Sequence, residues 1–158
     1  MFLERKLLTV KYALLVLAAV SLVIPASTHA QPRPPAGGGY QQTTQVINDC
    51  VRESNNFKKN LRRALNNSAL ANSPRERQLN TDANNLGSTM DRVGDSWNRD
   101  HNMQATRVYV NQAIAIAKDI NRTMVKWHLD PPTEQQWVVV RSQLNRLAQT
   151  FQLPKIPW

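Results

Sequence analysis

Four kinds of side chain in this 158-residue sequence could do chemistry: one thiol, isolated histidines, a pair of carboxylates and a run of cations. Cys50 is the single cysteine, which excludes an internal disulfide and a CxxC metal or redox site. It lies between Ile47 and Ser54 on an apolar stripe with helical spacing. We therefore expect a small buried hydrophobic residue; the alternative is an intermolecular disulfide in an oxidising compartment.

Beyond residue 30 the histidines are His101 and His128, and neither has a partner at HxxxH or HExxH spacing. Such isolated imidazoles make a poor zinc site, and the absence of CxxCH argues against covalently attached haem. His128 follows Trp127 near a predicted helix end, where a protonated imidazole would interact well with the helix C-terminus. We expect no metal and no cofactor, and a cofactor- or metal-carrying helical protein is kept as an alternative.

Asp91 and Asp95 are four residues apart on one predicted helix. Paired carboxylates can do acid–base work when their environments separate their pKa values. Here Arg92 and Arg99 are neighbours, and Asp95 with Arg99 has the favourable i,i+4 order of a solvated ion pair. Because the sequence also lacks GxSxG, GxGxxG and GxxxxGK[ST], it predicts a protein that is not an enzyme.

The basic residues are the most suggestive group in a chain whose formal charge is +9. Four of them lie close together on one predicted helix, namely Lys58, Lys59, Arg62 and Arg63. Arg52 extends the face that they form toward the start of that helix. This face could attract an anionic partner such as a membrane headgroup layer or an acidic polymer; the alternative is a solvated face that maintains solubility. Its one aromatic neighbour, Phe57, faces the predicted core, so no base-stacking platform for nucleic acid is present.

Residues 1–30 have the three parts of a secretory signal: basic residues, the apolar run 13–24, and a small residue, Ala30, at the cleavage position. As a helix, the run would span about 18 Å against roughly 30 Å of hydrocarbon, which is short for a permanent anchor. We expect cleavage after Ala30 and a periplasmic or secreted protein with at most peripheral membrane contact. An uncleaved anchor is the alternative.

After the signal peptide, the sequence predicts a flexible Pro/Gly-rich tether at 31–42, a helical domain at 43–153 and a C-terminal tail at 154–158. Apolar and small residues recur every three or four positions in four segments. The first two stripes are Ile47, Cys50, Ser54, Phe57, Leu61, Ala64, Ser68 and Leu79, Ala83, Leu86, Met90, Val93, Trp97. The next two are Thr106, Val110, Ala113, Ala117, Ile120, Met124, Trp127 and Trp137, Val140, Leu144, Leu147, Phe151.

Helix boundaries are also readable. Ser73, Pro74 and Glu76 form a capping box with proline at the first helical position, the residues 98–102 read as a loop, and Pro131 and Pro132 separate the last two helices. Four amphipathic segments with short connections predict an all-α, up-down-up-down four-helix bundle.

Two features point to contacts. Gly87 and Gly94 share one flank of the second helix, and we expect a packing groove filled by Trp127 or Trp137; a mobile helix that tolerates the glycines is the alternative.

Trp137, Val138 and Val139 together predict a small apolar patch for a partner or for self-association. A different helix rotation, or cover by the tether, would remove that patch.

Two motifs carry a resemblance. They are Phe57-x3-Leu61-x2-Ala64-Leu65-x2-Ser68 and Trp137-x2-Val140-Arg141-Ser142-x-Leu144-Asn145-x-Leu147-Ala148-x2-Phe151. Over roughly 44–158, the chain resembles small exported all-helical proteins of soil bacteria whose function is uncharacterised. That resemblance implies a helical fold and transfers no substrate and no catalytic residue, and this chain departs from it in being basic.

A weaker resemblance is to periplasmic chaperones of the Spy and CpxP type, which carry an LTxxQ motif. Thr133-Glu134-Gln135-Gln136 matches TxxQ, but Pro132 stands where the motif has leucine. A capping box accounts for the same residues. The sequence therefore predicts a non-enzymatic structural or binding protein of the cell envelope that contacts an anionic component or a protein; a periplasmic chaperone is the alternative.

Overall fold

The computed structural model describes residues 38–157, which contain four helices and no strand. Helix α1 spans Gly38–Asn66, α2 spans Pro74–Asp100, α3 spans Met103–Lys126 and α4 spans Pro131–Thr150. The predicted signal peptide, the tether residues 31–37 and Trp158 lie outside the described residues. None of the described helices is long and apolar enough to cross a membrane.

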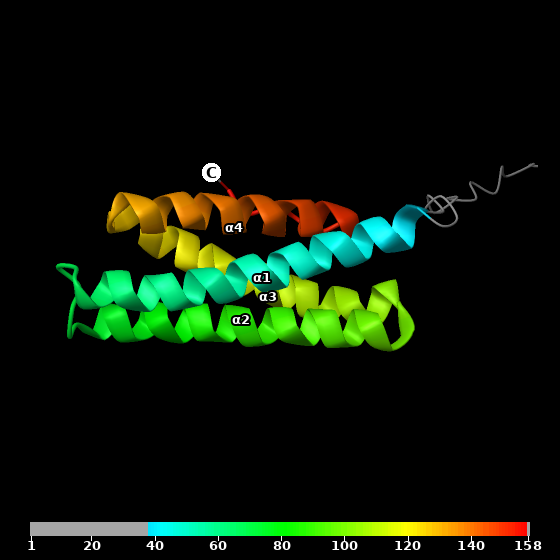
Figure 1. Ribbon diagram of the computed structural model, residues 1–158, viewed down its shortest axis with the longest axis horizontal. Helices are drawn as coiled ribbons and strands as arrows, with labels where there is room; N and C mark the ends of the chain where they lie inside the picture. The colour runs from blue at the N-terminus through cyan, green and yellow to red at the C-terminus, as the bar shows by residue number, and fades with distance from the viewer. Residues whose placement is uncertain (1–37, 158) are drawn as a thin grey trace, which may run out of the picture. The chain divides into compact units, whose positions relative to one another are not determined.

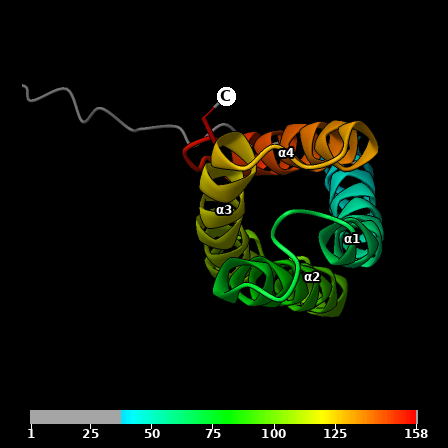
Figure 2. The ribbon, with the colours of Figure 1, turned by 90° about the vertical axis from the view of Figure 1, so that its left-hand side faces the viewer.

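The four helices form a bundle in which consecutive helices run in opposite directions (Figure 1). Each helix packs beside the next one in the chain, and α4 returns to pack beside α1 (Figure 2). The connections 67–73 and 127–130 lie at the same end of the bundle, which we call the loop end (Figure 1). The all-helical prediction with four helices is therefore confirmed.

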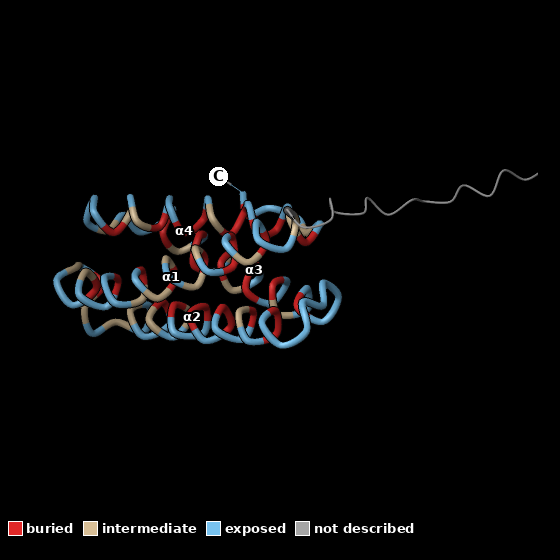
Figure 3. The backbone as a smooth tube through the Cα atoms, turned by 45° about the vertical axis from the view of Figure 1, so that its right-hand side comes forward, coloured by how far each residue is buried: buried red, intermediate tan, exposed pale blue. Residues whose placement is uncertain are grey.

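The buried side of each helix faces the centre of the bundle (Figure 3). The predicted stripe is fully buried in α2 and α4, while the α1 stripe ends in half-buried Ala64 and Ser68. In α3 the stripe is buried through Met124, but Trp127 is 37% exposed. The prediction for Trp127 is wrong because α3 ends at Lys126, so the helical spacing no longer determines where the next side chain points.

Helix α1 begins before the Thr43 expected from the sequence, and the prediction of a flexible tether is wrong for residues 38–42. The reason is an aromatic contact. The ring of Tyr40 lies 5.9 Å from that of Trp97 and 5.7 Å from that of His101, measured between centroids. Trp97 also donates from Nε1 to Thr44 Oγ1 at 2.8 Å, which fixes the first turns of α1 on the end of α2.

The start of α2 is capped as predicted. Ser73 Oγ accepts from the backbone N–H of Glu76 at 3.1 Å, and the Glu76 carboxylate accepts from the backbone N–H of Asn72. The far end of α2 differs from the prediction, because 98–100 are helical rather than loop. His101 ends the helix in the left-handed conformation with φ 52°, and Asn102 then caps α3.

The predicted C-terminal tail is not a free end. Beyond α4, Leu153 is half-buried and Ile156 is 1% exposed, whereas Pro154, Lys155 and Pro157 face solvent. Asn121 of α3 and Asn145 of α4 both bind the main chain of this segment. The tail therefore belongs to the folded unit.

Candidate functional site

Four exposed or half-exposed cations lie on the last three turns of α1, near the loop end; Lys58, Lys59, Arg62 and Arg63 are called the basic surface below. Phe57 and Leu61 of the same helix are fully buried. Because they occupy the inward side of α1, the four cations point outward and to the two flanks of the helix. Lys58 reaches the α2 flank, where its Nζ lies near Gly87. Arg63 faces the opposite flank, toward α4.

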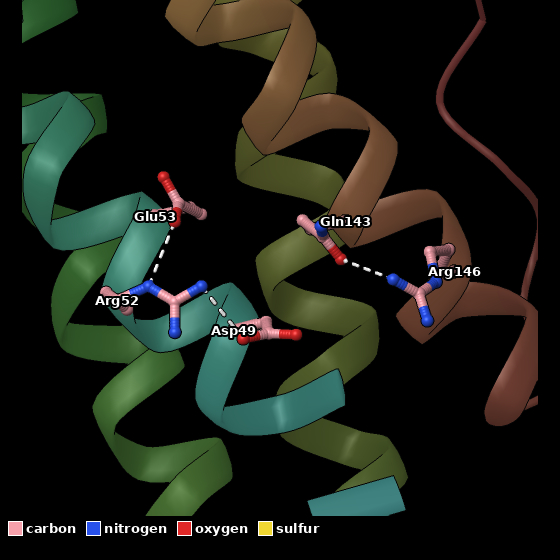
Figure 4. A network of polar contacts seen from close by, with 5 residues as sticks. All are labelled: Asp49, Arg52, Glu53, Gln143 and Arg146. Atoms are coloured by element: carbon pink, nitrogen blue, oxygen red, sulfur yellow. Dashed lines mark hydrogen bonds and ion pairs between the residues drawn. The ribbon is translucent and has the colours of Figure 1, made fainter. Parts of the chain in front are cut away.

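Within residues 38–157, no ion pair neutralises any of these four cations. Arg52, which the sequence assigned to the same face, is different. It lies 2.9 Å from Asp49 Oδ1 and 3.0 Å from Glu53 Oε1 (Figure 4). Hydrogen bonds to Glu53 and Asp49 raise the pKa of Arg52. Arg52 is therefore exposed on the same helix, but two carboxylates of that helix balance its charge.

Trp127 adds an aromatic ring to the loop end. It is 37% exposed, and two cations lie over its ring: Arg75 Cζ at 5.3 Å from the centroid and Lys126 Nζ at 5.9 Å. Cation–π contacts of this kind hold a ring in place, and Trp127 remains partly exposed to water. The loop end therefore combines the basic surface with an amphipathic tryptophan between two further cations.

A hollow of about 610 Å³ lies between the end of α1 and the start of α4. Its polar lining includes Asn60, Arg63, Asn67, His128, Asp130 and Gln136. Asn60 donates from Nδ2 to Gln136 Oε1 at 2.9 Å, so the two helices are linked at the hollow. The lining is mixed, because Ala64, Ala69, Leu129 and Pro132 lie among these polar side chains.

The residues of the TxxQ match hold the loop before α4 in place. Glu134 Oε1 accepts from the backbone N–H of Leu129 and lies 3.1 Å from His128 Nδ1, and Thr133 is buried. His128 therefore pairs with Glu134, and its expected interaction with the end of α3 stays a prediction. Because these side chains are used inside the fold, they give the chaperone resemblance no added support.

The two glycines of α2 do face a neighbouring helix, but that helix is α1. A Cβ at Gly87 would lie 3.1 Å from Asn55 Oδ1, and a Cβ at Gly94 would lie 3.7 Å from Val51 Cγ2. The prediction that a tryptophan fills this groove is wrong. Trp127 lies at the loop end, and Trp137 packs on Phe57 at 5.1 Å between ring centroids.

The predicted apolar patch is reduced to two valines. Val138 and Val139 are 41% and 39% exposed, as the sequence predicts for outward positions. Trp137 is 3% exposed and donates from Nε1 to Asn121 Oδ1 at 3.0 Å. Its assignment to the patch is wrong because α4 turns the indole toward α1 and α3.

The remaining candidate groups do not converge. Cys50 is buried, and desolvation, followed by the charge of Asp49, raises the pKa of its thiol. Asp91 accepts from Asn55 Nδ2 at 3.1 Å, while Asp95 and Arg99 are exposed and form no ion pair among the described residues. No group of three or more His, Cys, Asp or Glu side chains in that part of the chain could hold a metal ion.

Comparison with protein-family models, with curated proteins and with solved structures finds no match to this chain. The resemblance to small exported helical proteins therefore stays a prediction.

Sequence reasoning missed the contribution of Arg75, Lys126 and Trp127 to the loop end. Signals for it were present. The helix start at Ser73-Pro74 places Arg75 in the first turn of α2, and the stop at Asp130-Pro131 places Lys126 and Trp127 just before the next connection. In an antiparallel bundle these two boundaries meet at the same end.

Proposed function

We propose that this protein is a non-enzymatic, exported helical protein that binds the anionic lipid surface of the cell envelope with its loop end. The observation that carries the proposal is the set of four cations on α1 without an ion pair among the described residues. A half-exposed tryptophan, Trp127, lies at the same end of the bundle, at the end of α3.

The size of the electrostatic term supports a peripheral contact. Each Lys or Arg near an anionic leaflet contributes about 1 kcal/mol, so the basic surface would supply on the order of 4 kcal/mol at low salt. That is enough for reversible binding and too little for permanent anchoring. Salt should weaken it, because the Debye length shortens to about 8 Å at physiological ionic strength.

Trp127 favours a lipid surface over a soluble acidic polymer. Tryptophan is enriched at membrane–water interfaces, where its apolar ring and polar N–H are both accommodated. Here Arg75 and Lys126 both lie over the ring, so cations and an aromatic side chain would reach the headgroup layer together. A polymer in water would use the charges alone.

The proposal is tested by sedimentation of the protein with lipid vesicles. Vesicles with 30% anionic lipid are compared with purely zwitterionic ones at low and high salt. Reversal of two exposed cations, Lys59→Glu with Arg62→Glu, should weaken binding to anionic vesicles at least about tenfold at low salt. Trp127→Ala should weaken the binding that persists at high salt.

The matched control is Arg92→Glu with Arg99→Glu, which makes the same change in net charge at exposed positions on α2. This variant should retain most of the binding, because α2 carries these residues away from the loop end. Equal loss in both double variants, or equal binding to zwitterionic vesicles, would contradict the proposed surface.

Export is part of the proposal and has its own measurement. Cleavage after Ala30 would give a protein that begins with Gln31. Mass spectrometry of the protein from the periplasmic fraction should find that N-terminus. Recovery of the uncleaved chain from the cytoplasm would contradict export.

A further inference from the structure

The segment 153–157 is folded back onto the outside of the bundle. At the end of α4, Gln152 adopts the left-handed conformation with φ 54°. The N–H of Leu153 donates to Ala148 O at 2.8 Å and that of Gln152 to Gln149 O at 3.1 Å. This is the Schellman arrangement that reverses a chain at a helix end. The chain then lies beside α3 and α4 (Figure 2).

Asn145 of α4 binds this segment by its main chain. Its Oδ1 accepts from the N–H of Ile156 at 2.7 Å, and its Nδ2 donates to the carbonyl of the same residue at 3.2 Å. Both groups belong to the backbone, so this contact is independent of the side chain bound. Pro157 favours an extended conformation at Ile156, because the residue before a proline avoids helical angles.

Asn121 of α3 makes the second contact and is held in position by its neighbours. Its Nδ2 donates to the carbonyl of Pro157 at 3.2 Å. Its Oδ1 accepts from Trp137 Nε1 at 3.0 Å and from Arg141 Nη1 at 2.9 Å. Asn121, Asn145 and Arg141 are all at most 8% exposed, so this polar network is built into the seam between α3 and α4.

Ile156 is the one fully buried side chain in the segment 153–157, and Leu153 packs half-buried against the core. Ile156 is 1% exposed, while Pro154, Lys155 and Pro157 face solvent. Helices α3 and α4 approach each other less than the other three neighbouring pairs do, and the segment is bound by Asn121 of α3 and Asn145 of α4. The segment thus resembles a short peptide held by two amides and one aliphatic anchor.

We infer that the α3–α4 seam is a binding site for an extended polypeptide segment in which an aliphatic residue precedes proline, and that residues 153–157 are its resident occupant. A partner segment would displace the tail and form the same main-chain bonds to Asn145 and Asn121. The tail is an internal competitor, because it is joined to the end of α4 by a fixed turn. This inference does not depend on the lipid-binding proposal.

Fluorescence polarisation tests the inference with a labelled peptide that has the sequence of residues 152–157. Ile156→Asp removes the anchor of the internal tail, so the variant should bind the peptide at least tenfold more tightly than the unaltered protein. Lys155→Asp is the matched control, since it places the same residue at an exposed neighbour and should leave binding unchanged. In the Ile156→Asp background, Asn145→Ala should abolish binding. If Ile156→Asp is folded and binds no better than the unaltered protein, the inference is overturned.

Hydrogen exchange of the unaltered protein gives a second test that needs no variant. If the tail leaves its seat without unfolding of the helices, the amide of Ile156 should exchange at least a hundredfold faster than that of Leu144 in α4. Equal protection of the two amides would show that the tail opens only when the whole bundle unfolds. That result would overturn the inference even if Ile156→Asp failed to fold.

Discussion

The guanidinium carbon of Arg75 lies 5.3 Å from the ring centroid of Trp127, which joins the first turn of α2 to the residue that ends α3. This contact places a large aromatic ring at the surface of the loop end. Trp137, only ten residues further along the chain, is instead enclosed by α1 and α3. The two tryptophans therefore have different tasks, and substitution can separate them.

Trp127→Ala should lower the free energy of unfolding by less than about 1.5 kcal/mol, because an exposed cation–π contact contributes about 0.5–1 kcal/mol. Trp137→Ala should cost about 3–5 kcal/mol, as expected for a buried aromatic side chain. Urea denaturation followed by circular dichroism measures both. A cost above 3 kcal/mol for Trp127→Ala would mean that its ring belongs to the core.

The two glycines of α2 should respond differently to alanine. Gly94→Ala should stabilise the protein by about 0.5–1 kcal/mol, since a Cβ there meets Val51 at an ordinary contact distance of 3.7 Å. At Gly87 a Cβ would lie 3.1 Å from Asn55 Oδ1, and the bond from Asn55 to Asp91 limits movement of that amide. Gly87→Ala should therefore stabilise less. Thermal melts of the two variants compare them directly, and a larger gain at Gly87 would contradict this packing.

The helical part of the core was predictable because helical spacing decides which side of an amphipathic helix is buried. The stripes of α2 and α4, the capping box at Ser73 and the burial of Cys50 all follow from local sequence. Trp127 marks the limit of this reasoning. The spacing of apolar residues in the sequence continues to Trp127, but α3 ends at Lys126. The direction of the Trp127 side chain is therefore no longer set by the helix.

Contacts between elements were less predictable. The sequence shows a cluster of cations, but the pairing of Arg52 with Asp49 and Glu53 depends on side-chain conformations. The packing of the tail 153–157 on α3 and α4 could not be predicted for another reason. A proline-rich end looks like a helix stop, and its seat is made by Asn121 and Asn145, which are distant in sequence from each other. Only the packed bundle brings those two amides together.

Cys50 should make stability fall at alkaline pH. Burial raises the pKa of its thiol above the ordinary value of 9.0, so the folded protein keeps the proton where the unfolded chain loses it. The unfolded state is therefore favoured as pH rises above about 9, with a slope near 1.4 kcal/mol per pH unit. The free energy of unfolding should decrease by this amount relative to Cys50→Ala, which lacks the thiol. A constant difference between the two proteins from pH 8 to pH 10.5 would contradict the burial of the thiol.

Gln152 occupies the position that glycine favours at a helix end, and its left-handed φ of 54° makes it a site for stabilisation. The left-handed conformation costs an ordinary residue about 1–2 kcal/mol, part of which glycine returns as greater freedom in the unfolded chain. Gln152→Gly should therefore raise the free energy of unfolding by about 0.5–1 kcal/mol.

The control is Gln149→Gly, an exposed position inside the last turn of α4, where the same substitution should destabilise by about 0.5–1 kcal/mol. Urea titration of both variants measures the contrast. Because the reversal at Gln152 also sets the direction of the tail, Gln152→Gly should slow hydrogen exchange at the Ile156 amide. Destabilisation by Gln152→Gly would mean that the amide side chain of Gln152 makes a contribution larger than the backbone strain. Faster exchange at Ile156 would mean that the turn is not what holds the tail in its seat.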